Sequence, residues 1–575
     1  MSLILILTIT LAFIASVNAT VHFKVLCSIS EYSGTGVTVY IDGKPNPMKS
    51  LNNDILWEFD YEGTPKEYYY EVTNTTQNEL TLFKSPRTWD PTSTTTFYEV
   101  FGRQRTIGDD IIKTIPRLFD PLEGYDKFSQ LFQEGELVVI NLKLSNQVYT
   151  ELISLAKNED VKFQMDFDLY TPYEKYQFTN ASLSLSGQGS KELEKKPYKI
   201  DLSENEADKS NSEIFDRKEF KLRSLRYDES YIKNKLAMDI GESLGVPVAQ
   251  SGICRLYINN SPYGLYEITD MYKKKFVRRF FKVEKTGETY NYGSLYKGVS
   301  HEYPAYLYSD FPGSTIQELY ESVVPPTAGY DPHQDIQKMI AWAEALQPTA
   351  TEAEIEKQFD IDMFLKYMAI EFLLCHWDGY LGNGNNFFIY VEPNNGKYHF
   401  FSYDFDLTFG KYCKATMSTL DTYTHDIIED ESNRKYGTGP KREPLLWTKI
   451  INNPAIKPKF EELLKNILTN LFNLEALGPR IQYFYDFYKV DMYWDVNSFN
   501  TIQTQNFNKG HELPTIENID AQFSDQSEPS ELKGYIKARS EFLKQTLNIP
   551  AFKSEGKGTV GGKLMTIGKA TENKN

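Results

Sequence analysis

Residues 403–410 read YDFDLTFG, so two aspartates stand one position apart among aromatic residues, and a glycine follows. Alternate side chains of an extended strand share a face, which predicts that Asp404 and Asp406 project together. The flanking sequence from 399 onward is too apolar for an exposed strand, and buried acids need partners. The stretch is either part of a cation site or a buried strand that ends in a turn, and the upstream sequence favours the cation site.

A loop rich in glycine and asparagine precedes this stretch. Asp378 follows a predicted helix over residues 360–375 and begins the sequence DGYLGNGNNFFIY. Three asparagines lie in that loop: Asn383, Asn385 and Asn386. An Asn-Asn-Gly turn at 394–396 predicts a hairpin that folds residues 403–410 back toward Asp378. Carboxylate and amide oxygens gathered in this way suit Mg²⁺, Mn²⁺ or Ca²⁺ rather than zinc.

The composition is that of an acidic globular protein. Its 575 residues are 41% hydrophobic and 14% aromatic, which supplies enough apolar surface for more than one core. The formal net charge of −17 argues against nucleic acid and against anionic membranes as partners, because both require a basic surface.

The first residues indicate secretion. An apolar run over 3–17 is followed by Val-Asn-Ala, which predicts a signal peptide at 1–19 and a mature chain that begins near Thr20. About 15 apolar residues are too few for a membrane span, so we expect no integral span. The tail at 552–575 is polar and Gly- and Lys-rich, unlike a lipid-anchor signal. A secreted, extracellular or spore or cell-surface location is predicted.

Between these ends the chain divides into two predicted domains. Residues 20–100 alternate apolar and polar positions between turn residues, which predicts a small antiparallel β-sandwich. Residues 101–136 are predicted as a linker. Residues 137–551 begin with strands around one helix and continue with several amphipathic helices. This order predicts an α+β domain with a cleft between a strand-rich half and a helical half.

Two further features depend on the secretory route. The four cysteines at 27, 254, 375 and 413 permit up to two disulfides, in three pairings that the sequence leaves open. Three glycosylation sequons are present, at Asn74, Asn180 and Asn259, and each predicts an exposed loop.

Five blocks give the second domain a family resemblance. GQGSKELEKKPYKI, FKLRSLRYDESYIKNKLA, YINNSPYGLYEITD, DGYLGNGNNFFIY and YDFDLTFG occur in the order seen in the spore-coat CotH family. Members of that family resemble atypical secreted protein kinases. The overall pattern is most similar to the invasin-type CotH proteins of mucoralean fungi. The resemblance implies an atypical, two-lobed, protein-kinase-like domain over residues 137–551.

The resemblance also implies roles for the acidic loop and its neighbours. Asp378 corresponds to the catalytic-loop aspartate, which orients or deprotonates the acceptor hydroxyl. Asp404 and Asp406 correspond to the paired aspartates that hold Mg²⁺ or Mn²⁺ on the phosphates of ATP. Asn383 matches the aspartate-to-asparagine spacing of protein kinases, whereas Asn386 better matches the CotH motif. Both are therefore candidate metal ligands.

The same resemblance places nucleotide contacts in the first block. Gly187 and Gly189 are expected to cradle phosphate, although SGQGSK is shorter than the kinase GxGxxG pattern. Three lysines of that block are candidates for phosphate pairing: Lys195, Lys196 and Lys199. At Asp270 the family usually has a glutamate, which is a departure from its pattern.

Three functions are compatible with these residues. The leading hypothesis is a secreted Mg²⁺- or Mn²⁺-dependent kinase that transfers phosphate from ATP to hydroxyls of a protein substrate, either itself or a coat protein. The alternative is an invasin or adhesin of the spore coat or cell surface that binds a host-cell receptor on a kinase-like scaffold. Glycoside hydrolysis by Asp378 with Asp404 is the least favoured, because acids grouped with asparagines suit a cation better than acid/base catalysis.

Overall fold

The computed structural model describes residues 20–156, 160–203, 212–326, 330–429, 441–499, 501–502, 504–505, 507, 513–549 and 558–561. The predicted signal peptide at 1–19 lies outside the described residues, as does the predicted tail apart from 558–561. The chain forms two compact units. The first comprises residues up to Thr106 with 170–174, and the second holds the rest.

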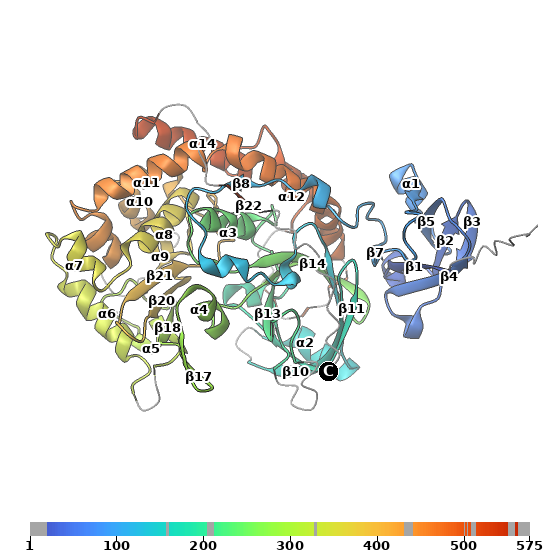
Figure 1. The fold of residues 1–575 in the computed structure, drawn as a ribbon, viewed down its shortest axis with the longest axis horizontal. Coiled ribbons are helices and arrows are strands. Elements are labelled where there is room, and N and C mark those ends of the chain that lie inside the picture. Colours follow the sequence, from blue (N-terminus) through green and yellow to red (C-terminus); the bar gives the residue numbers. More distant parts are fainter. Residues whose placement is uncertain are drawn as a thin grey trace, which may run out of the picture. The chain divides into compact units, whose positions relative to one another are not determined.

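The N-terminal unit contains two small sheets (Figure 1). Its core combines aromatic and aliphatic side chains. In the first sheet, β1 (Thr20–Leu26) pairs antiparallel with β4 (Leu56–Glu62) and parallel with β7 (Glu99–Val100). The second is antiparallel, in the order β3 (Lys44–Pro47), β2 (Val37–Ile41), β5 (Glu67–Val72), β6 (Arg87–Thr88). The parallel β1/β7 pair departs from the predicted all-antiparallel sandwich.

One predicted strand of this unit is a helix. The sequence LTLFKS at residues 80–85 predicts an extended strand, but α1 (Glu79–Phe83) forms there and begins where the Asn78 side chain accepts a hydrogen bond from the Leu80 amide. The prediction was wrong because the alternation of apolar residues over six positions did not reveal this cap.

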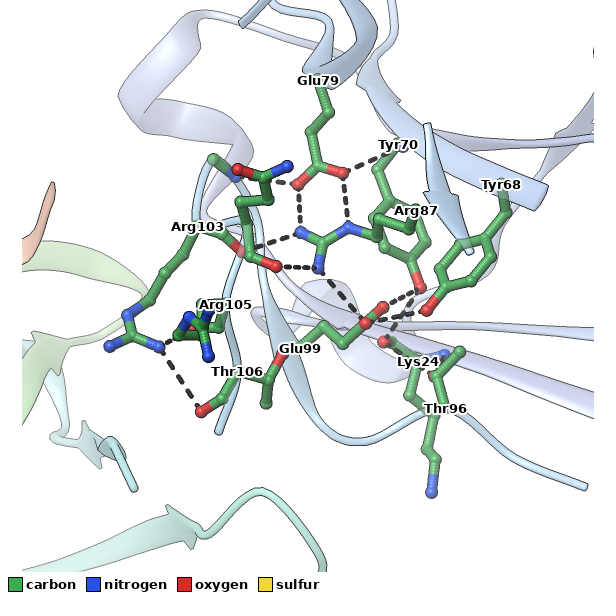
Figure 2. A network of polar contacts seen from close by, with 12 residues as sticks. Lys24, Tyr68, Tyr70, Glu79, Arg87, Thr96, Glu99, Arg103, Arg105 and Thr106 are labelled. Carbon is green, nitrogen blue, oxygen red and sulfur yellow. Dashed lines mark hydrogen bonds and ion pairs between the residues drawn. The ribbon is translucent and has the colours of Figure 1, made fainter. Parts of the chain in front are cut away.

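A buried ionic cluster joins the helix and strands of the N-terminal unit (Figure 2). Arg87 donates from Nε and Nη2 to the two oxygens of Glu79 at 2.8 and 2.6 Å, and its Nη1 lies 3.2 Å from Glu99. The hydroxyls of Tyr68 and Tyr70 each donate to Glu99 at 2.8 Å. The cluster is closed from solvent and links β5, β6, β7 and α1.

The second unit begins with a closed seven-stranded barrel, whose interior is filled with apolar side chains. Its strands follow the order β10 (Lys162–Tyr170), β11 (Lys175–Leu185), β12 (Tyr198–Asp201), β13 (Glu219–Arg223), β15 (Ser261–Thr269), β14 (Ser251–Ile258), β9 (Val138–Lys143). Two helices belong to this half, α2 (Asn146–Ser154) and α3 (Lys233–Ser243). The Asp228 carboxylate, five residues before α3 begins, accepts a hydrogen bond from the amide of the first helical residue, Lys233, at 2.7 Å.

The helical half of this unit is built around a four-stranded antiparallel sheet. Its order is β19 (Tyr320–Val324), β18 (Ser294–Gly298), β20 (Phe387–Val391), β21 (Tyr398–Ser402). The helices are α4 (Lys274–Phe280), α5 (Ile316–Leu319), α6 (Gln334–Ala345), α7 (Glu352–Glu356), α8 (Ile361–Leu374), α9 (Tyr380–Asn383), α10 (Tyr423–Glu429), α11 (Lys457–Asn470), α12 (Leu474–Ser498), α13 (Ile516–Phe523) and α14 (Leu532–Thr546). Helix α8 lies beside β21 (Figure 1). Helices and strands both contribute, as the predicted α+β class requires.

Two smaller strand pairings complete the description. A hairpin joins β16 (Glu284–Thr286) to β17 (Thr289–Asn291). Within the predicted linker, β8 (Ile115–Pro116) pairs antiparallel with β22 (Thr559–Val560) from the predicted tail. Nowhere in the described ranges is a helix both long enough and apolar enough to cross a membrane.

Candidate functional site

The candidate site is assembled around the end of α8. The helix starts at the Asp360 cap, whose side chain accepts from the Met363 amide at 3.0 Å, and ends at Cys375. The short helix α9 lies inside the glycine-rich loop that was predicted after it. A side chain at Gly382 would meet the Trp377 carbonyl at 2.0 Å, and Gly384 has a φ of +60°. These two positions therefore require glycine for the tight loop to form.

Asp378 is held by all three asparagines of this loop. Its Oδ1 accepts from the Asn383 amide at 3.2 Å, while its Oδ2 accepts from Asn385 and Asn386 at 3.1 and 2.8 Å. Burial raises the pKa of Asp378 to about 6, with a further contribution from Asp404, while the asparagine amides oppose the rise. A carboxylate with this pKa is mostly ionised at neutral pH and can accept a hydrogen bond or a proton.

The Asp404–Asp406 stretch departs from the predicted strand. The β20–β21 hairpin forms as predicted, but β21 ends at Ser402, and Asp404 has a φ of +64°. The expectation that alternation along a strand sets the direction of both aspartates was therefore wrong. The Tyr403 amide donates to the Asn386 carbonyl at 3.0 Å, which connects the end of the hairpin to the asparagine loop.

Arg223 of β13 holds both aspartates. Its Nη2 pairs with Asp404, lies 2.9 Å from Asp406, and its Nε lies 3.3 Å from Glu267 on β15. Although burial opposes ionisation of Asp404, the Arg223 guanidinium keeps the pKa of that carboxyl below its usual range. Burial and the adjacent Asp404 instead raise the pKa of Asp406 well above its usual range. One guanidinium therefore does not compensate the carboxylates around it.

Asn234 on α3 connects this cluster to the helix. Its side-chain amide donates to both oxygens of Glu267 at 2.8 Å, and its carbonyl oxygen accepts from the Phe405 amide at 2.9 Å. Asn234 and Glu267 are both almost completely buried. Hydrogen bonds of Asn234 thus connect α3 both to β15 and to the acidic stretch at 404–406.

A cavity of about 260 Å³ opens beside this cluster. Asp404, Arg223 and Asn234 line it, together with the aromatic rings of Tyr272, Phe388 and Tyr403. Its other basic lining residues are Lys191, Lys199, Lys221, Lys273 and Lys297. Basic side chains therefore outnumber the acidic ones, Asp270, Glu321 and Asp404, so the cavity favours an anion. A larger groove of about 930 Å³, lined mainly by α7, α8 and α11, contains none of the predicted site residues.

Only two of the five residues that were predicted to contact phosphate line the cavity. Gly187 and Lys199 line the cavity, whereas Gly189, Lys195 and Lys196 do not. Lys195 is buried and pairs at 2.7 Å with Asp495 of α12. Lys196 is buried as well and donates to the Lys191 carbonyl at 2.6 Å.

Lys221 was missed by the sequence prediction. It lines the cavity, and no carboxylate of the described residues lies within ion-pair distance of its Nζ. Burial, together with Lys297, lowers the pKa of Lys221 to about 8. In contrast, Lys199 already pairs with Asp201 and Glu219 at 3.1 and 2.8 Å. The sequence FKLR at 220–223 contained the information needed to predict it. Lys221 and Arg223 alternate with apolar residues on one strand, so both project from the same face.

Asp270, where the sequence departs from the family pattern, is buried between two arginines. Arg217 donates to it at 3.0 Å and Arg279 at 2.5 Å. The three sequon asparagines are exposed: Asn74, Asn180 and Asn259. Asn180 lies within strand β11 rather than in the predicted loop.

Comparison with known proteins identifies the family. The family model described as "CotH kinase protein" matches residues 183–543, a stretch that contains all the residues around the cavity and both acidic segments. The chain belongs to the CotH family.

Named CotH proteins resemble the chain over a longer or shorter part of its length. Invasin CotH2 of Rhizopus delemar is 28% identical over 65% of this chain and 61% of its own length. Invasin CotH7 of the same fungus is 24% identical over 85% of this chain and 76% of its own length. Inner spore coat protein H of Bacillus subtilis is 22% identical over 64% and 87%. The chain thus spans about three fifths of the length of Invasin CotH2.

Proposed function

We propose that this CotH protein is a phosphotransferase that moves the terminal phosphoryl group of ATP to a hydroxyl of a protein substrate, on an atypical kinase-like two-lobed domain. The observation that carries the proposal is the position of Asp378. This carboxylate is held by three amides and is close enough to Asp404 for their charges to interact, and Asp404 lines a cavity rich in lysine. Phosphoryl transfer requires this combination of positioning and charge neutralisation.

The residues present fit a divalent cation. Among the described residues, no group of three or more His, Cys, Asp or Glu side chains is arranged as a ready metal site. The donor set here instead combines two carboxylates with amide oxygens, and the raised pKa of Asp406 beside Asp404 indicates that Arg223 alone does not support ionisation of both carboxyl groups. Such oxygen donors suit Mg²⁺ or Mn²⁺, which would neutralise phosphate charge when bound.

The side chains of this chain supply the remaining tasks. Asp378 would orient the acceptor hydroxyl and accept its proton. Asn383 and Asn386 donate to Asp378 through their side-chain NH₂ groups, and their side-chain Oδ1 atoms have no hydrogen-bond partner within the described part of the chain. Both oxygens therefore remain candidate metal ligands. The Asn385 carbonyl, by contrast, accepts from the Ser300 amide at 3.2 Å.

We assign the phosphate-pairing role to Lys221 rather than to Lys195 or Lys196. Lys221 faces the cavity without a carboxylate partner among the described residues, whereas the other two ammonium groups are used inside the fold. Gly187 and Lys199 line the same cavity and would contact the nucleotide from the loop after β11 and from β12. The cavity volume of about 260 Å³ lies slightly below the range of about 300–1,000 Å³ that is usual for ligand sites.

The test separates binding from transfer. Calorimetric titration of ATP with Mg²⁺ or Mn²⁺ should show binding to the wild type and to Asp378→Asn, and at least tenfold weaker binding to Lys221→Met. Lys195→Met is the control for loss of a lysine outside the cavity. Phosphate transfer to a protein, measured with labelled ATP, should be lost in Asp378→Asn. Full transfer by that variant would contradict the assignment, and absence of nucleotide binding by the wild type would contradict the proposed function.

The names of the relatives favour a second candidate. Two are named invasins and one an inner spore coat protein, which supports a surface or spore-coat role with host-cell binding. Binding of the purified protein to host cells tests this role, with Asp378→Asn and Asp404→Asn as variants. Unchanged binding by both would make adhesion independent of the acidic site, and no binding by the wild type would contradict an adhesive role.

A further inference from the structure

A disulfide closes a ring of chain that contains the acidic and asparagine residues of the candidate site. Cys375 directly follows α8, and Cys413 lies seven residues after Asp406; their Cα atoms are 6.1 Å apart. The bond closes a ring of chain with a sequence separation of 38. Every residue predicted for catalysis or metal binding lies between the two cysteines: Asp378, Asn383, Asn386, Asp404 and Asp406.

Backbone contacts join the two ends of this ring. The Phe409 amide donates to the Leu374 carbonyl at 2.6 Å, and the Trp377 amide donates to the Leu407 carbonyl at 3.1 Å. His376 Nε2 lies 2.9 Å from the carbonyl of Asp404, so this nitrogen carries the hydrogen. The segment after β21 is therefore attached to the end of α8 close to both aspartates.

The ring contains several unfavourable backbone conformations. Five residues that are not glycine have positive φ angles between 49° and 64°: Cys375, Asn386, Asp404, Phe409 and Tyr412. A positive φ is sterically unfavourable for residues that carry a Cβ atom. Such conformations therefore persist only where surrounding contacts hold them. Both cysteines are buried, so the cross-link belongs to the interior of the site and not to its surface.

We propose that the Cys375–Cys413 disulfide is a positioning element: it holds the Asp404–Asp406 stretch against the Asp378 loop, so that the metal and nucleotide site is assembled only in the oxidised protein. The role in nucleotide binding rests on the proposed function, whereas the role in ordering residues 404–413 does not. A dithiol such as dithiothreitol would break the S–S bond by thiol–disulfide exchange. Cys375 and Cys413 would each gain a hydrogen as thiols, while the two thiols of the reagent would form a cyclic disulfide.

The experiment compares two ways of weakening the same unit. Cys375→Ala with Cys413→Ala opens the ring, while Leu468→Ala removes a fully buried side chain of α11 outside it. Cys254→Ser, a change at a free and buried cysteine of the barrel, controls for the loss of a thiol. Hydrogen exchange is measured on peptides that cover residues 404–413 and on peptides from the barrel, without nucleotide, and Mg²⁺·ATP affinity is measured by calorimetry.

We expect the ring variant to speed exchange in residues 404–413 at least tenfold and to weaken Mg²⁺·ATP binding at least tenfold, with the barrel unchanged. The other two variants should keep both properties. If the ring variant does not fold, the same exchange measurement on wild type reduced with dithiothreitol replaces it. Exchange at the oxidised rate in either form would overturn the proposal, as would an equal loss of affinity in Leu468→Ala. A wild type that binds no nucleotide would reject the proposed function, yet the exchange result would still decide the role of the ring.

Discussion

Two arginines in this protein are each shared among several carboxylates, yet the two clusters differ in what surrounds them. Arg87 in the N-terminal unit faces Glu79 and Glu99, whose oxygens also accept from tyrosine hydroxyls and a backbone amide (Figure 2). All three charged side chains of this cluster are buried. Arg223 in the second unit faces Asp404, Asp406 and Glu267, and it borders a cavity.

The two clusters differ in the number of carboxylates that share one arginine and in whether the cluster borders a cavity. The Arg87 cluster is sealed, and its partners come only from the fold, so a structural role explains it. The Arg223 cluster has one more carboxylate, raises the pKa of Asp406, and leaves Asp404 at the wall of a cavity. A buried charge network is therefore better evidence for a binding site when it is incomplete and accessible than when every atom has a partner.

The largest effect is expected from breaking the sealed cluster. Arg87→Met leaves two buried carboxylates without a counter-charge, which should destabilise the N-terminal unit by about 3–5 kcal/mol. Hydrogen exchange in the full-length protein should rise in peptides covering β5 and β7. Mg²⁺·ATP affinity should stay unchanged, and a change in it would contradict the separation of the two clusters.

Neutralising the open cluster should affect function rather than folding. On the proposed function, Asp404→Asn should lower phosphate transfer about a hundredfold to a thousandfold, because it removes a proposed ligand of the cation that would neutralise the phosphate charge. Asp406→Asn should cost less, since Asp406 does not line the cavity and its raised pKa shows that its charge is already disfavoured. Transfer rates at saturating metal, with melting temperature as the control, measure both. Equal losses would contradict the ranking of the two aspartates.

These two clusters also separate what the sequence could predict from what it could not. The hairpin and the Asp378 loop were predictable because an Asn-Asn-Gly turn and a run of glycines and asparagines are local signals. Arg223 is 181 positions from Asp404, and the sequence around either residue does not predict that the two form an ion pair. Helix α12, which supplies Asp495 to Lys195, was not predicted, because its aromatic residues face several directions and Gly478-Pro479 interrupts the helical pattern. Long-range pairing of charges was thus the missing information.

A smaller effect should appear in the pH dependence of transfer. The pKa of Asp378 is about 6, and the asparagine amides lower it by stabilising the charged form. Asn386→Ala removes one such donor, so the pKa of Asp378 should rise and the acid limb of the rate profile should move up by about one pH unit. Transfer measured from pH 5 to 9 checks this shift. Asn395→Ala, in the turn of the β20–β21 hairpin, is the control and should leave the limb in place.

The smallest effect is expected at His399. Its protonated ring is shared between two carboxylates, as each arginine is, but histidine can lose its charge by deprotonation. Its two ring nitrogens lie 2.9 Å from Asp360 and from Glu392. Although burial opposes protonation, these carboxylates raise the pKa of His399 above its ordinary value of about 6.5. The histidinium should therefore contribute about 1 kcal/mol that is fully present below pH 6.5 and is lost as the pH rises through the raised pKa. The melting temperature of the wild type should fall relative to His399→Gln across that range, and parallel curves would show that this third cluster, unlike the arginine clusters, does not depend on its charge.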